Sequence, residues 1–165
     1  MIEVGERIPQ VKLWLATAQG GEPVATGAYF GGRKILLFGL PGAFTPTCSE
    51  IHLPGYIAKA KELRAAGIDA IACVAVNDPY VMAAWGDAAG ATGKVDLLAD
   101  GNGELARALG LEVDRTAGGM GRRCRRFAAV IEDGVFTMLA VEPASGVTVC
   151  GADHLLEALG ESSPG

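Results

Sequence analysis

Two short apolar runs, each followed by a segment with helical periodicity, constrain the fold of this chain more than any other feature. Residues 35–38 (Ile-Leu-Leu-Phe) and 70–76 (Ala-Ile-Ala-Cys-Val-Ala-Val) are bounded by turn-forming residues and are short for buried helices. Such runs predict buried strands. Because helical segments follow both of them, we expect an α/β fold.

The rest of the chain continues this alternation of strands and helices. Pro54 should kink or restart the first long helix, since proline has no N–H to donate to the helical ladder. The tripeptide Glu132-Asp133-Gly134 is typical of a β-hairpin turn. With no linker, repeat or low-complexity segment, residues 1–165 are predicted to form one domain, with a central mixed β-sheet flanked by helices. Further strands are predicted at 11–16, 95–98, 127–131 and 135–141, and helices at 49–66, 79–89, 104–109 and 153–159.

Cys48 lies where the first apolar strand gives way to a helix. Either Thr45 caps this helix with Pro46 as its first residue, or Thr47 caps it and Glu50 closes a capping box. In both arrangements the cysteine belongs to the first helical turn. The unpaired amide N–H groups and the positive end of the helix dipole favour a negative charge on its sulfur. Cys48 is therefore predicted to be a nucleophile.

Charge and cysteine usage argue against several classes of function. A formal charge of −5 disfavours nucleic acid or an anionic membrane as the main partner, and the one basic run, 122–126, has no interleaved aromatic residues. No apolar run approaches the length of a membrane span, and the N-terminus lacks a secretory signal pattern. We expect a cytoplasmic protein whose four cysteines are thiols at rest. The absence of a Cys-x-x-Cys pair and the presence of only two histidines argue against structural zinc.

The spacing Pro41-x-x-x-Thr45-x-x-Cys48 resembles the peroxidatic signature of the peroxiredoxins. The likeness covers nearly the whole chain, and the segment around Cys48 is its specific part. Segments similar to the type-five subfamily are 38–56, which contains this signature, 76–78 (Val-Asn-Asp), 85–86 (Trp-Gly), 94–100 (Lys-Val-Asp-Leu-Leu-Ala-Asp) and 125–127 (Arg-Arg-Phe).

The resemblance implies a thioredoxin-like fold and a thiol-dependent peroxidase. Such an enzyme reduces hydrogen peroxide and small organic hydroperoxides to water or alcohol through a cysteine sulfenic acid. The resemblance also implies a homodimer that is regenerated by a thiol reductant, namely thioredoxin, glutaredoxin or glutathione. No cofactor or metal is expected, because the sequence shows no ligand cluster, P-loop or dinucleotide-binding glycine pattern.

Cys48 needs more than ionisation to reduce a peroxide quickly. A free thiol is a few per cent ionised at pH 7, so complete ionisation accelerates the reaction by at most roughly 30-fold. The rest requires donors for the charge that develops on the leaving oxygen. Thr45, through its hydroxyl, and Arg126, through its place in the Arg-Arg-Phe segment, are the predicted donors. Pro41 is predicted to shape and dry the pocket. If this stretch is already extended, Arg125 points to the other face of the sheet.

The other cysteines decide what happens once Cys48 is a sulfenic acid. Cys150 matches the resolving position of two-cysteine family members and is the leading candidate to form a disulfide with Cys48, with a one-cysteine cycle as the alternative. Cys73 lies inside an apolar strand and is expected to be inert core. Cys124 should have a lowered pKa if it is exposed, and in an extended strand it would share a face with Arg126. It could resolve, be glutathionylated, or be a plain surface residue.

His52 and Phe44, which lie close to Cys48 in the sequence, each have two possible roles, and two other functions are alternatives to the peroxidase. His52 either adds positive potential near Cys48 or packs through hydrogen bonds, and Phe44 either lines a substrate wall or, as expected, belongs to the core.

The alternative function is a peroxide-responsive redox sensor or chaperone-like protein that uses the same Cys48. A disulfide oxidoreductase is disfavoured by the missing Cys-x-x-Cys pair.

Overall fold

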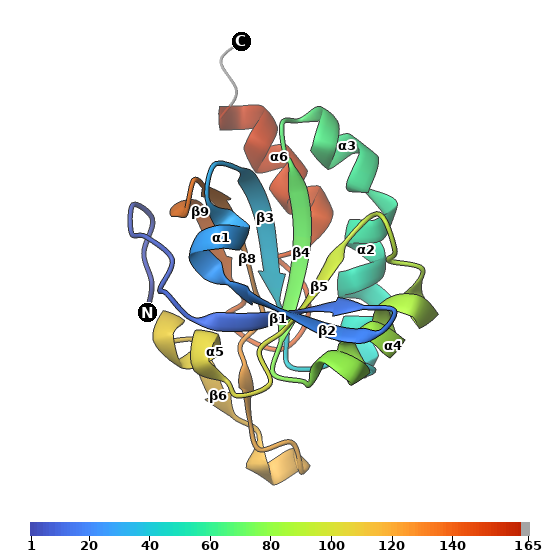
Figure 1. The fold of residues 1–165 in the computed structure, drawn as a ribbon. Coiled ribbons are helices and arrows are strands. Elements are labelled where there is room, and N and C mark those ends of the chain that lie inside the picture. The colour runs from blue at the N-terminus through green and yellow to red at the C-terminus, as the bar shows by residue number, and fades with distance from the viewer. Residues whose placement is uncertain (163–165) are drawn as a thin grey trace.

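A seven-stranded mixed sheet forms the centre of the structure, a computed structural model that describes residues 1–162 (Figure 1). Its strands are β1 Lys12–Thr17, β2 Gly20–Ala25, β3 Lys34–Gly39, β4 Ala70–Ala75, β5 Asp96–Ala99, β8 Phe127–Glu132 and β9 Val135–Val141. The spatial order is β2-β1-β5-β4-β3-β8-β9. Strands β3, β4 and β5 are parallel, whereas the outer pairs are antiparallel.

Helices cover both faces of this sheet. One face carries α2, α3, α4 and α6, whose apolar residues share one core that includes Tyr56 and Trp85. The other face carries α1 and α5, which pack around Phe30 and Leu105 (Figure 1). The predicted mixed sheet flanked by helices is therefore confirmed. The helices are α1 Thr26–Phe30, α2 Leu53–Ala58, α3 Ala60–Ala65, α4 Pro79–Ala89, α5 Glu104–Leu109 and α6 Ala152–Ser162.

Pairing of the central strands brings Arg126 close to the segment that contains Cys48. Strand β4 is buried along its whole length and β3 nearly so, as expected of apolar runs covered on both faces. Strand β3 pairs with β8 so that Gly39 lies opposite Phe127. The residue that precedes β8, Arg126, is thereby brought to the end of β3, where the segment containing Cys48 begins.

The hairpin between β8 and β9 has the predicted turn. Glu132 pairs with Val135, and the two residues between them have positive φ angles, 48° for Asp133 and 80° for Gly134. An Asp-Gly pair accepts this conformation readily, and its twist matches that of the flanking strands.

The predicted helix over 49–66 is not continuous. A π-helical turn, η1 Cys48–His52, precedes α2, and a second break separates α2 from α3 at Lys59, whose φ and ψ are −102° and 8°. The predicted restart at Pro54 is confirmed, since this proline lies in the first turn of α2. The break at Lys59 has no proline or glycine as a signal in the sequence.

Several short elements were not predicted. Strand β2 contains two glycines and Pro23, which a sheet tolerates because β2 is an edge strand. A second, two-stranded sheet extends from the main body (Figure 1). It consists of β6 Glu112–Asp114 and β7 Arg122–Cys124, joined through the 3₁₀ turn η2 Thr116–Gly118.

Candidate active site

The helical segment that carries Cys48 begins at Pro46, so Thr45 holds the capping position of the first predicted arrangement. Thr47 already has helical torsion angles, φ −64° and ψ −38°, and its side chain makes no capping hydrogen bond. The arrangement in which Thr47 caps and Glu50 closes a capping box is therefore wrong. Cys48 lies in the first turn, as both arrangements required.

A π-helical turn then runs from Cys48 to His52. The amide of Leu53 donates to the Cys48 carbonyl, whereas in an α-helix it would donate to Ser49. Pro54 follows and has no N–H to donate, so the ordinary ladder cannot form across this point. Wide turns of this kind occur often at functional sites.

Hydrogen bonds to neighbouring elements hold the loop between β3 and this turn. The amide of Ala43 donates to Asn77 Oδ1 at 2.9 Å, which assigns a role to the Val-Asn-Asp segment that follows β4. Phe44 has a left-handed φ of 61° and is 57% exposed. Its expected place in the core is therefore wrong, because the backbone of the loop turns its side chain outward.

Thr45 and Pro41 both lie in this loop. The Thr45 hydroxyl donates to the Gly42 carbonyl at 2.7 Å, so its proton is committed and its oxygen is left to accept. The predicted use of Thr45 as a donor to the reacting atoms is not what this geometry shows. Pro41 is buried, and its carbonyl accepts from Arg123 Nη1 at 3.4 Å. A buried proline without an N–H fits the predicted shaping and drying of the pocket.

Arg126 reaches from the start of β8 to the nucleophile. Its Nη2 donates to Cys48 Sγ at 3.2 Å, and its Nη1 lies 2.9 Å from His52 Nδ1. Cys48 has no exposed surface, and Arg126 is half-buried. The contact places a permanently charged donor directly on the sulfur of Cys48, in a site removed from water.

His52 is neutral in this arrangement. Burial, followed by the positive charge of Arg126, lowers the pKa of His52 to about 3. Since Nδ1 accepts from Arg126, the ring proton lies on Nε2, which donates to the Cys150 carbonyl 3.1 Å away. The interpretation of His52 as a source of positive potential is wrong, and hydrogen-bonded packing is confirmed.

Cys150 belongs to the same buried cluster. Its carbonyl also accepts from the Tyr56 hydroxyl at 2.6 Å, and its Sγ is directed at the Ala140 carbonyl, 3.2 Å away. Burial and the carboxylate of Glu142 raise the pKa of Cys150. Among the described residues, all four cysteines are free and buried. A chain of hydrogen bonds through Arg126 and His52 thus connects the Cys48 sulfur to the Cys150 carbonyl. The two sulfur atoms are not bonded to each other.

Cys124 lies elsewhere than predicted. It is 3% exposed and packs in the core on the sheet face opposite Cys48, and burial raises its pKa. The chain changes from the small sheet to the main sheet across 125–126, so the alternation of faces does not carry through to Arg126. The expected surface position is therefore wrong for Cys124, and the exposure on which a lowered pKa depended is absent. Cys73 is buried core with a raised pKa, as expected of an inert thiol.

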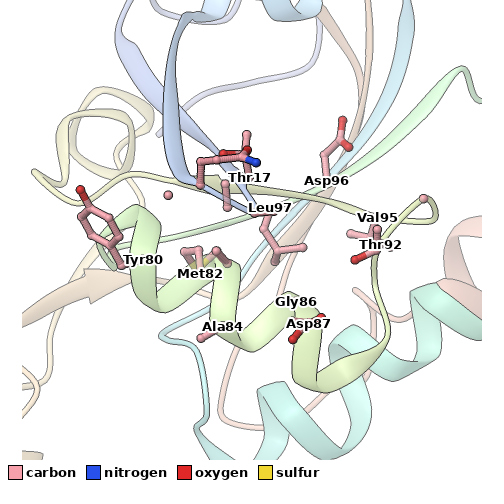
Figure 2. A pocket seen from close by; sticks show the side chains of 16 residues that line it. Thr17, Tyr80, Met82, Ala84, Gly86, Asp87, Thr92, Val95, Asp96 and Leu97 are labelled. Atoms are coloured by element: carbon pink, nitrogen blue, oxygen red, sulfur yellow. The ribbon is translucent and has the colours of Figure 1, made fainter.

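The cavity in Figure 2 is not formed by these residues. It has a volume of about 660 Å³ and lies between the turn that joins β1 to β2, helix α4 and β5, with Tyr80 and Asp96 among its lining residues. None of the predicted site residues lines it. Within residues 1–162, no three side chains of metal-ligating type form a group, and no helix is long and apolar enough to cross a bilayer.

Sequence reasoning missed two residues that hold Cys150. Tyr56 lies one helical turn after His52, so the two side chains share a helix face, and this spacing was a usable signal. Glu142 holds the backbone amide of Cys150 through its carboxylate at 2.8 Å. No pattern distinguishes this glutamate from a solvated surface residue.

The comparisons with known proteins agree with one another. The model of the family described as Redoxin matches residues 3–156. Peroxiredoxin-2E-2, chloroplastic, from Oryza sativa subsp. japonica is 48% identical over a match that covers 96% of this chain and 72% of the relative. The crystal structure of reduced Prx3 in complex with H2O2 from Vibrio vulnificus is 46% identical, with a TM-score of 0.92 over 96% of this chain and 99% of that one. Peroxiredoxin 5 from Alvinella pompejana is 34% identical, with a TM-score of 0.87 over 98% of this chain and 100% of that one.

The chain therefore belongs to the redoxin family, and within it to the peroxiredoxins. It has the thioredoxin-like fold and is a thiol-dependent peroxidase, as predicted. An enzyme that turns over peroxide is favoured over a sensor that oxidises only once.

Proposed function

We propose that Cys48 is the peroxidatic cysteine and that Arg126 stabilises the charge that moves in the reaction. The hydrogen bond of 3.2 Å from Arg126 Nη2 to Cys48 Sγ carries this assignment. The Cys48 thiolate attacks one oxygen of the hydroperoxide, the O–O bond breaks, and the leaving oxygen takes up a proton to give water or an alcohol. Cys48 is left as a sulfenic acid. The guanidinium is positioned to support the thiolate first and the departing oxygen afterwards.

Thr45 and Pro41 have supporting roles in this proposal. With its proton directed at the Gly42 carbonyl, Thr45 accepts the O–H of the incoming hydroperoxide and orients the substrate for attack. Pro41 presents no donor that would compete for the peroxide oxygens and keeps that side of the pocket dry. Hydrogen peroxide and small organic hydroperoxides are the substrates that we propose, since the H2O2 complex of the Vibrio vulnificus relative supports a small peroxide.

Cys150 is proposed as the resolving thiol. Its sulfur attacks the sulfur of the Cys48 sulfenic acid, water leaves, and a disulfide forms. A thiol reductant, thioredoxin, glutaredoxin or glutathione, then reduces the disulfide to two thiols. The buried cluster that joins the Cys150 carbonyl to the Cys48 sulfur through His52 and Arg126 supports this pairing.

We place the enzyme in the type-five subfamily and in the cytoplasm. The sequence motif around Cys48 and the likeness to peroxiredoxin 5 from Alvinella pompejana support the subfamily. Four free thiols among the described residues support a reducing compartment. Fractionation of the native source checks the compartment.

A homodimer is the proposed assembly. Phe44 and Ile51 flank Cys48 in sequence and are 57% and 56% exposed, which is unusual for large apolar side chains. We propose that they lie in the dimer interface. Light scattering of wild type and Ile51→Lys tests this, with a dimer expected for wild type and a monomer for the variant, and a monomeric wild type would contradict it.

Intact-mass spectrometry after one equivalent of hydrogen peroxide tests the catalytic assignments. Wild type is expected to lose two hydrogens, whereas Cys48→Ser stays unmodified and Cys150→Ser gains one oxygen on Cys48. Full peroxidase activity in Cys48→Ser would contradict the role of Cys48. One added oxygen on wild-type Cys48, unaffected by Cys150→Ser, would indicate a one-cysteine cycle.

A further inference from the structure

Glu142 is a buried carboxylate whose hydrogen bonds all come from one short segment. The side chain is 4% exposed. Its two oxygens accept from the amides of Thr148, Val149 and Cys150 at 2.7 to 3.0 Å and from the Thr148 hydroxyl. No lysine or arginine side chain among the described residues forms an ion pair with it. The carboxylate therefore serves to hold the segment 148–150, which ends at Cys150.

The backbone of the same residue is bound to Arg126 of the peroxidatic site and to the neighbouring Arg125. The Glu142 amide donates to the Arg126 carbonyl at 3.0 Å, and Arg125 Nη2 donates to the Glu142 carbonyl at 3.3 Å. Glu142 thus has a backbone bound to Arg126, whose side chain contacts Cys48, and a side chain that holds the segment carrying Cys150. Burial opposes ionisation, but the hydrogen bonds from the 148–150 segment outweigh it and lower the pKa of Glu142 to about 2. The carboxylate is charged at any physiological pH.

Cys150 is a buried thiol in the position that Glu142 gives it. It has no exposed surface, its sulfur is directed at the Ala140 carbonyl, and its own carbonyl is held by His52 and Tyr56. The burial and the carboxylate that raise the pKa of Cys150 keep it a thiol, whereas the thiolate is the attacking form. Because its sulfur is directed at the Ala140 carbonyl and is not bonded to Cys48, Cys150 has to turn away from this contact before it can attack the Cys48 sulfur.

We propose that Glu142 is a positioning residue for the resolving step: it latches the 148–150 segment and so sets the rate at which Cys150 attacks oxidised Cys48. The inference rests on the proposed role of Cys150. While the latch is closed, the sulfenic acid at Cys48 persists and meets a second hydroperoxide. In that competing reaction the sulfur gains a second oxygen to become a sulfinic acid, and the hydroperoxide is reduced to water or alcohol. A tight latch therefore slows disulfide formation and makes Cys48 more sensitive to oxidation by excess peroxide.

Glu142→Gln is the central variant, because it keeps the size of the side chain and removes its charge. A glutamine also turns one of the two accepting oxygens into an NH₂ group, which cannot accept from the amides of the segment. Thr148→Val removes only the hydroxyl contact from an exposed position and keeps the charge, so it serves as the milder variant. Glu132→Gln makes the same chemical change at an exposed glutamate and is the matched control.

The experiment follows two rates by quenched-flow alkylation and intact mass, one for oxygen gain on Cys48 and one for the later loss of two hydrogens. Relative to wild type, disulfide formation is expected to be about tenfold faster in Glu142→Gln, since charge-assisted hydrogen bonds are lost, and a few times faster in Thr148→Val. The rate of oxygen gain should be unchanged, and the sulfinic acid formed at excess peroxide should decrease. Glu132→Gln should behave as wild type in all three measurements.

The outcomes separate this inference from the proposed function. A Cys48–Cys150 disulfide in wild type whose rate of formation is unchanged or slower in both latch variants overturns the latch alone. If neither wild type nor the variants form that disulfide, Cys150 does not resolve, and the latch fails together with that assignment. If Cys48 gains no oxygen at all, the peroxidatic assignment itself fails.

Discussion

Arg126 Nη2 lies 3.2 Å from Cys48 Sγ, although the two residues are 78 positions apart in the chain. Strand pairing produces this contact. Because Phe127 lies opposite Gly39 in the β3–β8 ladder, the residue before Phe127 falls beside the loop that leads to Cys48. The arginine therefore reaches the nucleophile from the sheet, while the cysteine is presented by a helix.

Replacing Arg126 by methionine removes the charge and keeps much of the side-chain volume. We expect the second-order rate constant with hydrogen peroxide to fall by about 100-fold or more, because a preorganised charged donor is lost from the transition state. Stopped-flow measurement of peroxide consumption checks this. Arg122→Met is the control, since Arg122 is exposed and pairs with Glu112, and its rate should stay at the wild-type value. A rate within twofold of wild type in Arg126→Met would remove the arginine from the mechanism.

The buried His52 gives stability a pH dependence with a definite sign. Its pKa is lowered in the folded state to about 3, so the unfolded chain binds this proton more readily. The contribution of His52 to the free energy of unfolding is therefore fully present above its unfolded pKa of about 6.5. It decreases as the pH falls, by up to about 1.4 kcal/mol per pH unit. Between pH 6.5 and 5 the Glu142 carboxylate contributes little to the pH dependence, because both its folded pKa of about 2 and its unfolded pKa of about 4.3 lie below this range.

Urea unfolding of His52→Gln at several pH values between 6.5 and 5 tests this sign. The decrease of the free energy of unfolding should disappear in this variant and persist in His154→Gln, where the histidine is exposed on α6. An equal pH dependence in wild type and His52→Gln would show that another group is responsible.

Most of the fold was predictable because the elements have local signals. The apolar runs of β3 and β4, the helix that begins at Pro79 and the Asp-Gly turn between β8 and β9 each rest on neighbouring residues only. The position of Cys48 in a first helical turn was predictable for the same reason. Strand β2 was missed because its glycines and Pro23 resemble a loop, and only its place at the sheet edge accommodates them.

The site was less predictable where it depends on tertiary packing. Period-two alternation placed Cys124 and Arg126 on one face, but the chain passes from the small sheet to the main sheet between them. The neutral state of His52 follows from burial and from Arg126, a partner distant in the sequence. The partners of Glu142 are close in the sequence, at residues 148–150, but the loop conformation that turns their amides toward its carboxylate has no sequence signal.

Gly39 should be intolerant of a side chain, with an effect on both stability and activity. A Cβ at this position would lie 2.1 Å from Phe127 Cε1, and Phe127 is fully buried. Gly39→Ala therefore has to displace Phe127, and with it the backbone of Arg126, at a cost of about 3 kcal/mol in the free energy of unfolding. Gly55→Ala is the matched control, because a Cβ there meets nothing within 4 Å and alanine suits a helix better than glycine. Thermal and urea unfolding of the two variants should give shifts of opposite sign.

Cys124 should be dispensable for the catalytic cycle, because it is buried on the sheet face opposite Cys48. In native protein we expect iodoacetamide to leave Cys124 unmodified, since burial removes it from solvent and raises its pKa. Cys124→Ala should still lose two hydrogens with one equivalent of hydrogen peroxide, whereas Cys150→Ala should not. Peptide mapping of the alkylated and the oxidised proteins measures both properties. A Cys124→Ala variant that folds normally but accumulates sulfenic acid on Cys48 would make Cys124, and not Cys150, the resolving thiol.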